Sequence, residues 1–153
     1  MKAIFLDIEA TLIQSMDSPV EMNFAHKIFD FVRGKENVFI FSWALWDEND
    51  VEKFVNSHIF KWICENVGQT IPRERIISKH SLRDSFSNFI RTVDLNDFLD
   101  ICQSKEWSFE SFVRFDSRVS EFNQFIFFDD RVENKSMRIG PKEIWFVKAE
   151  EGM

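Results

Sequence analysis

Apolar residues gather in short runs along the chain, and these runs have the length of buried strands. Four of them occupy residues 3–6, 38–41, 125–128 and 144–147, and a shorter candidate covers residues 76–78. Short apolar runs without polar residues at alternate positions are typical of strands buried on both faces of a parallel sheet. The pattern therefore predicts a mostly parallel sheet with covered faces.

Between these runs the apolar residues take the spacing of a helix face. Residues 24–32 repeat apolar positions at intervals of three and four, which predicts a helix that ends near Gly34. Residues 51–63 carry the clearest stripe of this kind, and Asn49 resembles the start of its capping box. His58 falls on that stripe, so we expect it in the core or at its boundary.

The middle of the chain has a weaker pattern. Segment 79–104 contains two short helical candidates and could form a small lid, and Ser108 is expected to cap the next helix. Strands that alternate with helices predict an α/β fold with a doubly wound, mostly parallel sheet and helices on both faces. At this length, residues 1–153 are expected to form a single domain.

Composition narrows the classes of function. The chain has 19 Phe and 5 Trp but no Tyr, so most of its aromatic mass lacks a hydroxyl and is expected in the core. A formal net charge of -7 argues against a broad surface that binds nucleic acid electrostatically. It leaves open a small anionic substrate that binds together with a metal ion.

Cysteine and histidine give no metal pattern. Cys64, Cys102 and the three histidines lack the spacing of zinc ligands. The sequence also shows neither a secretory signal nor an apolar run of membrane length. We therefore expect a reduced, cytoplasmic protein without a membrane partner, and the sequence carries no signal for an oligomeric state.

Polar residues that can do chemistry follow three of the apolar runs. Asp7 and Glu9 follow the first run, Ser42 follows the second, and Asp129 and Asp130 follow run 125–128. Parallel strands end at one edge of a sheet, where acids repel each other unless a cation lies between them, and carboxylate oxygens suit Mg²⁺. An Asp such as Asp7 could then attack a phosphoryl group to form an aspartyl-phosphate.

Three segments contain these residues. Residues 7–12 read Asp-Ile-Glu-Ala-Thr-Leu, strand 38–42 ends in Ser42, and residues 129–134 read Asp-Asp-Arg-Val-Glu-Asn. Together they resemble motifs one, two and four of the haloacid dehalogenase-like (HAD) hydrolases, a superfamily made up mostly of magnesium-dependent phosphatases. The resemblance implies a Rossmann-like core and a small or cap-less phosphatase.

The resemblance also implies a role for each matching residue. Asp7 would be the nucleophile, and Glu9 would protonate the leaving group. Lys105, or alternatively Lys79, would supply the cation of the third motif, and Ser42 would bind the substrate phosphate. The other candidates are Thr11 and Arg131 for contacts to phosphate, and Asp7, Glu9, Asp129, Asp130 and Asn134 for magnesium.

Two positions depart from the family pattern. The second acid of the family is normally Asp, whereas Glu9 is one methylene longer. A displacement of about 1 Å can slow an enzyme roughly 100-fold, so this change bears directly on activity. Ala10 replaces the usual glycine, which reduces backbone freedom.

The sequence leaves several substrates and functions open. The stretch between Asp7 and Ser42 is too short for a large cap domain, so an open site could accept a phosphorylated small molecule, a nucleotide or a polynucleotide end. A catalytically weak HAD-fold binding or regulatory protein is one alternative, because Glu9 departs from the pattern. A DEDD-type exonuclease is another, because Asp7 and Glu9 also resemble its first motif.

Overall fold

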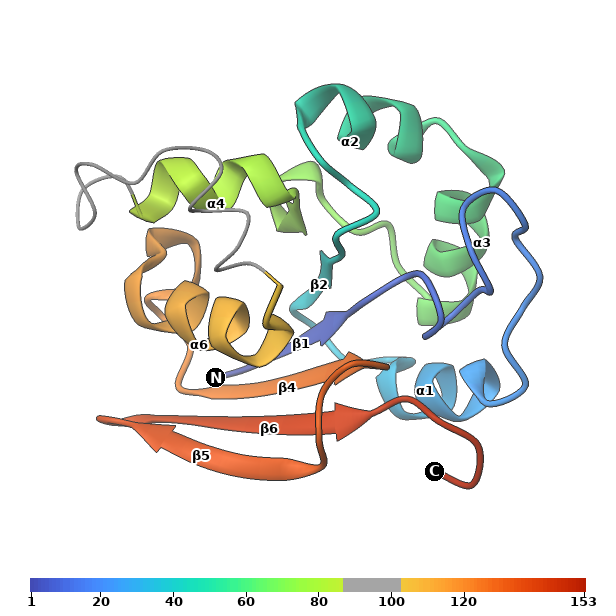
Figure 1. The fold of residues 1–153 in the computed structure, drawn as a ribbon. Coiled ribbons are helices and arrows are strands. Elements are labelled where there is room, and N and C mark those ends of the chain that lie inside the picture. The colour runs from blue at the N-terminus through green and yellow to red at the C-terminus, as the bar shows by residue number, and fades with distance from the viewer. Residues whose placement is uncertain (87–102) are drawn as a thin grey trace.

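A six-stranded mixed sheet forms the centre of the computed structural model, which describes residues 1–86 and 103–153 (Figure 1). The strand order is β3-β2-β1-β4-β6-β5, and only the β5–β6 pair is antiparallel among the pairs described. The mostly parallel α/β fold is confirmed. The strands are β1 (Lys2–Leu6), β2 (Val38–Phe41), β3 (Ile76–Ile77), β4 (Gln124–Asp129), β5 (Lys135–Ile139) and β6 (Lys142–Lys148).

Helices pack on both faces of this sheet (Figure 1). Apolar side chains of α1, α2 and α3 join one buried cluster, and those of α4 and α6 join another. The described helices are α1 (Ala25–Val32), α2 (Glu48–Val55), α3 (His58–Val67), α4 (Lys79–Phe86) and α6 (Lys105–Phe115), with short 3₁₀ turns η1 (Arg73–Arg75) and η2 (Ser117–Val119).

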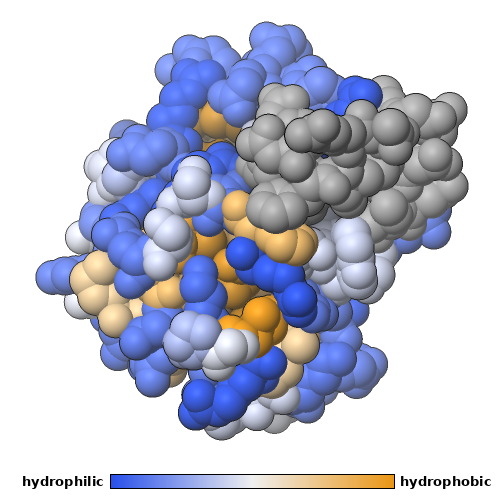
Figure 2. All heavy atoms as spheres, turned by 90° about the vertical axis from the view of Figure 1, so that its left-hand side faces the viewer, coloured by the Kyte–Doolittle hydropathy of each residue, from blue (hydrophilic) through white to orange (hydrophobic). Residues whose placement is uncertain are grey.

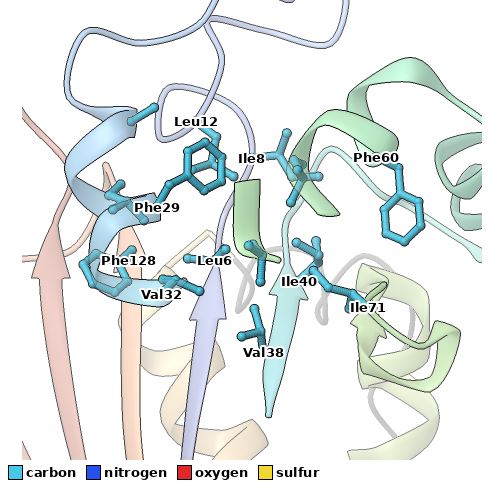
Figure 3. Close-up of a cluster of buried hydrophobic side chains, with 14 of the residues drawn as sticks. Leu6, Ile8, Leu12, Phe29, Val32, Val38, Ile40, Phe60, Ile71 and Phe128 are labelled. Carbon is cyan, nitrogen blue, oxygen red and sulfur yellow. The ribbon is translucent and has the colours of Figure 1, made fainter. Parts of the chain in front are cut away.

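The cluster beneath α1, α2 and α3 is largely aliphatic where it meets the sheet. Leu6 of β1 and Val38 and Ile40 of β2 point toward the helices, and Phe29 and Val32 of α1 point back at them (Figure 3). Successive strand residues point to opposite faces, so alternate residues of the same strands supply the other cluster. We call this first face the aliphatic face.

The cluster beneath α4 and α6 is built from phenylalanine. Phe5 of β1 stacks on Phe39 with 4.5 Å between ring centroids, and Phe109 of α6 stacks on Phe127 of β4 at the same distance. Phe41 contacts Phe109 edge to face. The expected Phe-rich core is therefore concentrated on one side of the sheet, which we call the aromatic face.

Local capping differs from the expectation in the first long helical stripe. The stripe at 51–63 is divided between α2 and α3, because the Ser57 hydroxyl accepts the Phe60 N–H and starts a new helix. Asp47, rather than Asn49, caps α2 through the Asp50 N–H. His58 is exposed at the first position of α3, so its expected burial is wrong.

The third helical region also starts earlier than expected. Ser104 caps α6 by accepting the Trp107 N–H, and Ser108 lies inside the helix, so the expected cap at Ser108 is wrong. The expected lid at 79–104 begins with helix α4, and residues 87–102, Cys102 included, lie outside the described residues. Strand β5 was not expected.

The described surface is mainly hydrophilic on the side where α4 and α6 lie. Figure 2 shows hydrophobic side chains in patches between hydrophilic ones on this side. The large apolar residues exposed anywhere on the described surface are Met1, Val20, Phe31, Trp46, Trp107, Phe115 and Trp145. Among the described helices, none is both long and apolar enough to cross a membrane.

Candidate active site at the carboxyl edge of the sheet

Asp7 is held at the end of the central strand β1. Its backbone N–H donates to the Phe128 carbonyl of β4 at 3.1 Å, which extends the strand pairing by one residue. The Thr11 hydroxyl, fully buried, donates to Asp7 Oδ2 at 3.1 Å. These two hydrogen bonds hold Asp7 in place. The other carboxylate oxygen, Oδ1, faces Lys105.

Lys105 is the first residue of α6 and brings a buried ammonium to this carboxylate. Its Nζ lies 3.4 Å from Asp7 Oδ1 and 3.0 Å from Asp129 Oδ2. The same nitrogen lies 4.6 Å from the centroid of the Trp43 ring and 5.8 Å from that of Phe127. Only 3% of the lysine side chain is exposed, so carboxylates and aromatic rings replace water around the charge.

Asp129 and Asp130 follow directly from β4, beside β1. Asp129 is fully buried, and its Oδ1 accepts the Arg131 backbone N–H at 2.6 Å. Asp130 is half-buried. Carboxylate oxygens of Asp7, Asp129 and Asp130 all lie within 4.8 Å of one another, a spacing that allows them to share one cation.

The pKa of each of the three carboxyl groups is raised. Burial raises the pKa of Asp7 above the usual carboxyl range, although the Lys105 ammonium opposes this effect. Burial and then the charge of Asp7 raise the pKa of Asp129, and burial and then the charge of Asp129 raise that of Asp130. One ammonium does not balance three carboxylates, so a divalent cation with oxygen ligands fits this cluster.

A cavity of about 390 Å³ opens in front of these groups. It brings together six of the candidate site residues, which come from the segments directly after β1, β2 and β4 and from the start of α6. Its lining comprises Asp7, Glu9, Ala10, Gln14, Ser15, Ser42, Trp43, Ala44, Lys105, Asp130 and Arg131. A larger cavity, of about 710 Å³, is lined by residues between 55 and 70 and contains none of the three clustered aspartates.

Besides Lys79, three candidate residues lie outside the lining of the cavity. Thr11 is buried behind Asp7, to which its hydroxyl is bound. Asp129 is fully buried and is ion-paired with Lys105. Asn134 is exposed, and its Oδ1 accepts the Lys148 N–H at 2.7 Å.

The two candidate cations of the third motif are clearly separated by geometry. Lys105 contacts Asp7 and lines the cavity. Lys79 instead has its Nζ 5.5 Å from the centroid of Trp43 and 5.4 Å from that of Trp46. Lys105 is therefore the residue placed to neutralise charge on Asp7.

Glu9 is committed to the loop that follows β1. Its Oε2 accepts the Met16 backbone N–H at 2.7 Å, which joins the two ends of segment 9–16, and Gln14 and Ser15 of this segment line the cavity. Ala10 takes a φ of 59°, the left-handed conformation that glycine adopts without strain. Alanine thus takes a left-handed conformation at the position where the sequence resemblance leads us to expect glycine.

Trp43 is a site residue that the sequence pattern did not single out. It follows Ser42 directly, lines the cavity and lies against the Lys105 ammonium. The sequence offered one signal for Trp43: it is an aromatic residue directly after Ser42, a candidate ligand at the end of a strand. The contact itself depends on α6, which is remote in sequence.

No protein-family model matches the chain, and no match was found among curated proteins.

Proposed function

We propose that this protein is a magnesium-dependent phosphatase with a doubly wound core of the HAD type. The observation that carries the proposal is the buried contact between Asp7 and Lys105 at the carboxyl end of the central strand. Ser42, Glu9 and Asp130 line the cavity in front of that contact. Nucleophile, cation, hydroxyl and acids are the groups that phosphomonoester hydrolysis requires.

Each residue has a defined part in the reaction. A carboxylate oxygen of Asp7 attacks phosphorus, the bond between phosphorus and the leaving oxygen breaks, and an aspartyl-phosphate forms. Glu9 gives its proton to the leaving oxygen. Water then attacks the aspartyl-phosphate, Glu9 takes a proton from that water, and phosphate leaves. Lys105 offsets negative charge on Asp7, and the Ser42 hydroxyl donates to a phosphate oxygen.

Magnesium would be held by Asp7 and Asp130, with the Glu9 backbone carbonyl as a further ligand. It would supply positive charge to the phosphate and to the clustered acids. Asp129 would act through its ion pair with Lys105, since it does not line the cavity.

The proposal is tested by turnover of simple phosphomonoesters with and without magnesium. We expect metal-dependent release of phosphate that Asp7→Asn abolishes, and a phosphoryl adduct on Asp7 after acid quenching. Asp30→Asn, which removes an exposed acid on α1, is the matched control and should keep full activity. Absence of turnover, combined with an unchanged melting temperature in millimolar magnesium, would reject both the reaction and the metal site.

One observation favours a second candidate, a catalytically weak protein that binds phosphate. Glu9 already accepts a hydrogen bond from the Met16 N–H, and this contact competes with proton transfer to substrate. This alternative predicts that magnesium and phosphate bind without measurable turnover. A two-metal exonuclease fits less well, because the Lys105 ammonium lies between Asp7 and Asp129.

A further inference from the structure

A row of alternating cations and aromatic rings leads outward from the candidate phosphate site. The Lys105 ammonium lies 4.6 Å from the centroid of Trp43, and the Lys79 ammonium lies 5.5 Å from Trp43 and 5.4 Å from Trp46. The His80 ring follows, 6.4 Å from that of Trp46. Trp43 lines the cavity, whereas Trp46 is 37% exposed, so the row connects the cavity to the surface.

The backbone around these rings is well anchored. Trp43 and Trp46 lie in the loop between β2 and α2, directly after Ser42. The Lys79 N–H donates to the Leu45 carbonyl at 2.9 Å, and the His80 N–H donates to the Trp46 carbonyl at 2.7 Å. The loop is thereby joined to the start of α4, which anchors the backbone at Leu45 and Trp46, and Trp43 of the same loop lines the cavity.

We infer that the substrate is a nucleotide, with its phosphate at Ser42 and Lys105 and its base against the exposed ring of Trp46. This inference rests on the phosphatase function proposed above. Stacking on aromatic side chains is the general way in which proteins hold nucleobases without reading their sequence, and a nearby cation strengthens it. A sugar phosphate has no base to place against the exposed ring of Trp46.

The charge of the chain favours a free nucleotide over the end of a nucleic-acid strand. A formal net charge of -7 repels the additional phosphates of a polynucleotide. A nucleoside monophosphate brings a single phosphate, whose charge Lys105 and the proposed magnesium ion would offset together. The preferred substrate is therefore a nucleoside monophosphate.

Adenosine 5′-monophosphate and ribose 5-phosphate test this inference, because only the first carries a base. The measured quantity is the ratio of their kcat/KM values. We expect the ratio to exceed about 10 in the unmodified protein and to fall by about 5- to 100-fold in Trp46→Ala, the range typical of one stacked base. Trp46→Phe should restore most of the ratio. Trp145→Ala removes a similarly exposed tryptophan on β6 and should leave the ratio unchanged.

Failure of this inference is distinguishable from failure of the phosphatase proposal. A ratio near one, or a ratio that Trp46→Ala does not lower, overturns the stacking site while leaving the phosphatase intact. If neither compound is hydrolysed, calorimetry decides the stacking site alone: tighter binding of the nucleotide than of the sugar phosphate, lost in Trp46→Ala, supports it, and equal binding overturns it. Faster turnover of a 5′-phosphorylated oligonucleotide than of the mononucleotide would overturn the preference for a free nucleotide.

Discussion

The two faces of the sheet contribute different parts of the candidate site. On the aromatic face, α6 packs through Phe109 and Phe112 and carries Lys105 to the carboxylates. On the aliphatic face, the loop after β1 packs through Ile8 and Leu12 and carries Glu9. One face thus carries the buried ammonium of the site, and the other carries the carboxyl group that we propose as its general acid.

This difference gives a physical reason why Lys105 lies on a packed helix and Glu9 in a loop. A cation that neutralises a nucleophile, the role proposed for Lys105, must stay in place, and the rings of Trp43 and Phe127 beside Lys105 allow it little movement. An acid that exchanges protons with substrate and water must change partners. Glu9 is held by one hydrogen bond to a loop, which is easier to release than a packed helix.

The largest effect is expected from removing the charge on the aromatic face. Lys105→Met should lower turnover by about 10²–10³-fold, because it removes the group that stabilises charge on Asp7. It should also cost about 3–5 kcal/mol of stability, since two buried carboxylates lose their partner. Lys142→Met, at a half-buried lysine whose Nζ donates to the Val113 carbonyl on the same face, should retain activity. Turnover of Lys105→Met within tenfold of the unmodified protein would contradict the assignment.

The next effect comes from the acid on the aliphatic face. Glu9→Gln should slow hydrolysis of alkyl phosphates by about 100-fold or more, because a poor leaving group needs its proton. Nitrophenyl phosphate should suffer much less. Kinetics on both leaving-group classes check this, and an equal loss on both would leave Glu9 as a structural or metal-site residue. A large rise in rate for Glu9→Asp would indicate that the natural glutamate is an impaired substitute.

A matched pair of core substitutions tests the division between the faces. Phe109→Leu and Phe29→Leu each replace a fully buried aromatic ring with a smaller side chain. In denaturant titrations, both should therefore lower the free energy of unfolding by about 1–2 kcal/mol. Only Phe109 lies one turn from Lys105 on α6. Phe109→Leu should therefore lower kcat by about tenfold, whereas Phe29→Leu should keep it. Equal losses of activity in the two variants would show that the position of Lys105 does not depend on the packing of the aromatic face.

The smallest effect concerns the backbone of the loop on the aliphatic face. Ala10 takes a left-handed φ of 59°, which strains an alanine, so Ala10→Gly should stabilise the protein by about 0.5–1 kcal/mol in thermal unfolding. Ala3→Gly, inside β1, should instead destabilise it by about 0.5–1 kcal/mol. A loss of stability in Ala10→Gly would show that the loop relies on the stiffness of alanine there.

The sheet core was predictable because its strands are buried on both faces. Such strands read as unbroken apolar runs, as at 38–41 and 125–128. Strand β5 has no such run, since most of Lys135–Ile139 is exposed, and its partner β6 decides its conformation. The break at Ser57 was hidden because the helical spacing of apolar residues continues across it.

The candidate site was predictable as far as strand direction determines it. Parallel strands bring their ends together, which is why Asp7, Ser42 and Asp130 line one cavity. The contacts of individual side chains could not be predicted in the same way. The bond from the Met16 N–H to Glu9 and the contact of Trp43 with Lys105 depend on how loops and helices pack, and no local pattern encodes that.

The outer strands of the sheet have a consequence for behaviour at high concentration. A sheet whose central strands are almost wholly apolar would invite strand addition by another molecule if its edges were long and bare. At one edge β3 spans only Ile76–Ile77, which offers little template. At the other, β5 exposes Lys135 and Arg138, whose charges oppose the docking of a further strand. The molecule can therefore carry a very hydrophobic interior while its edges resist aggregation.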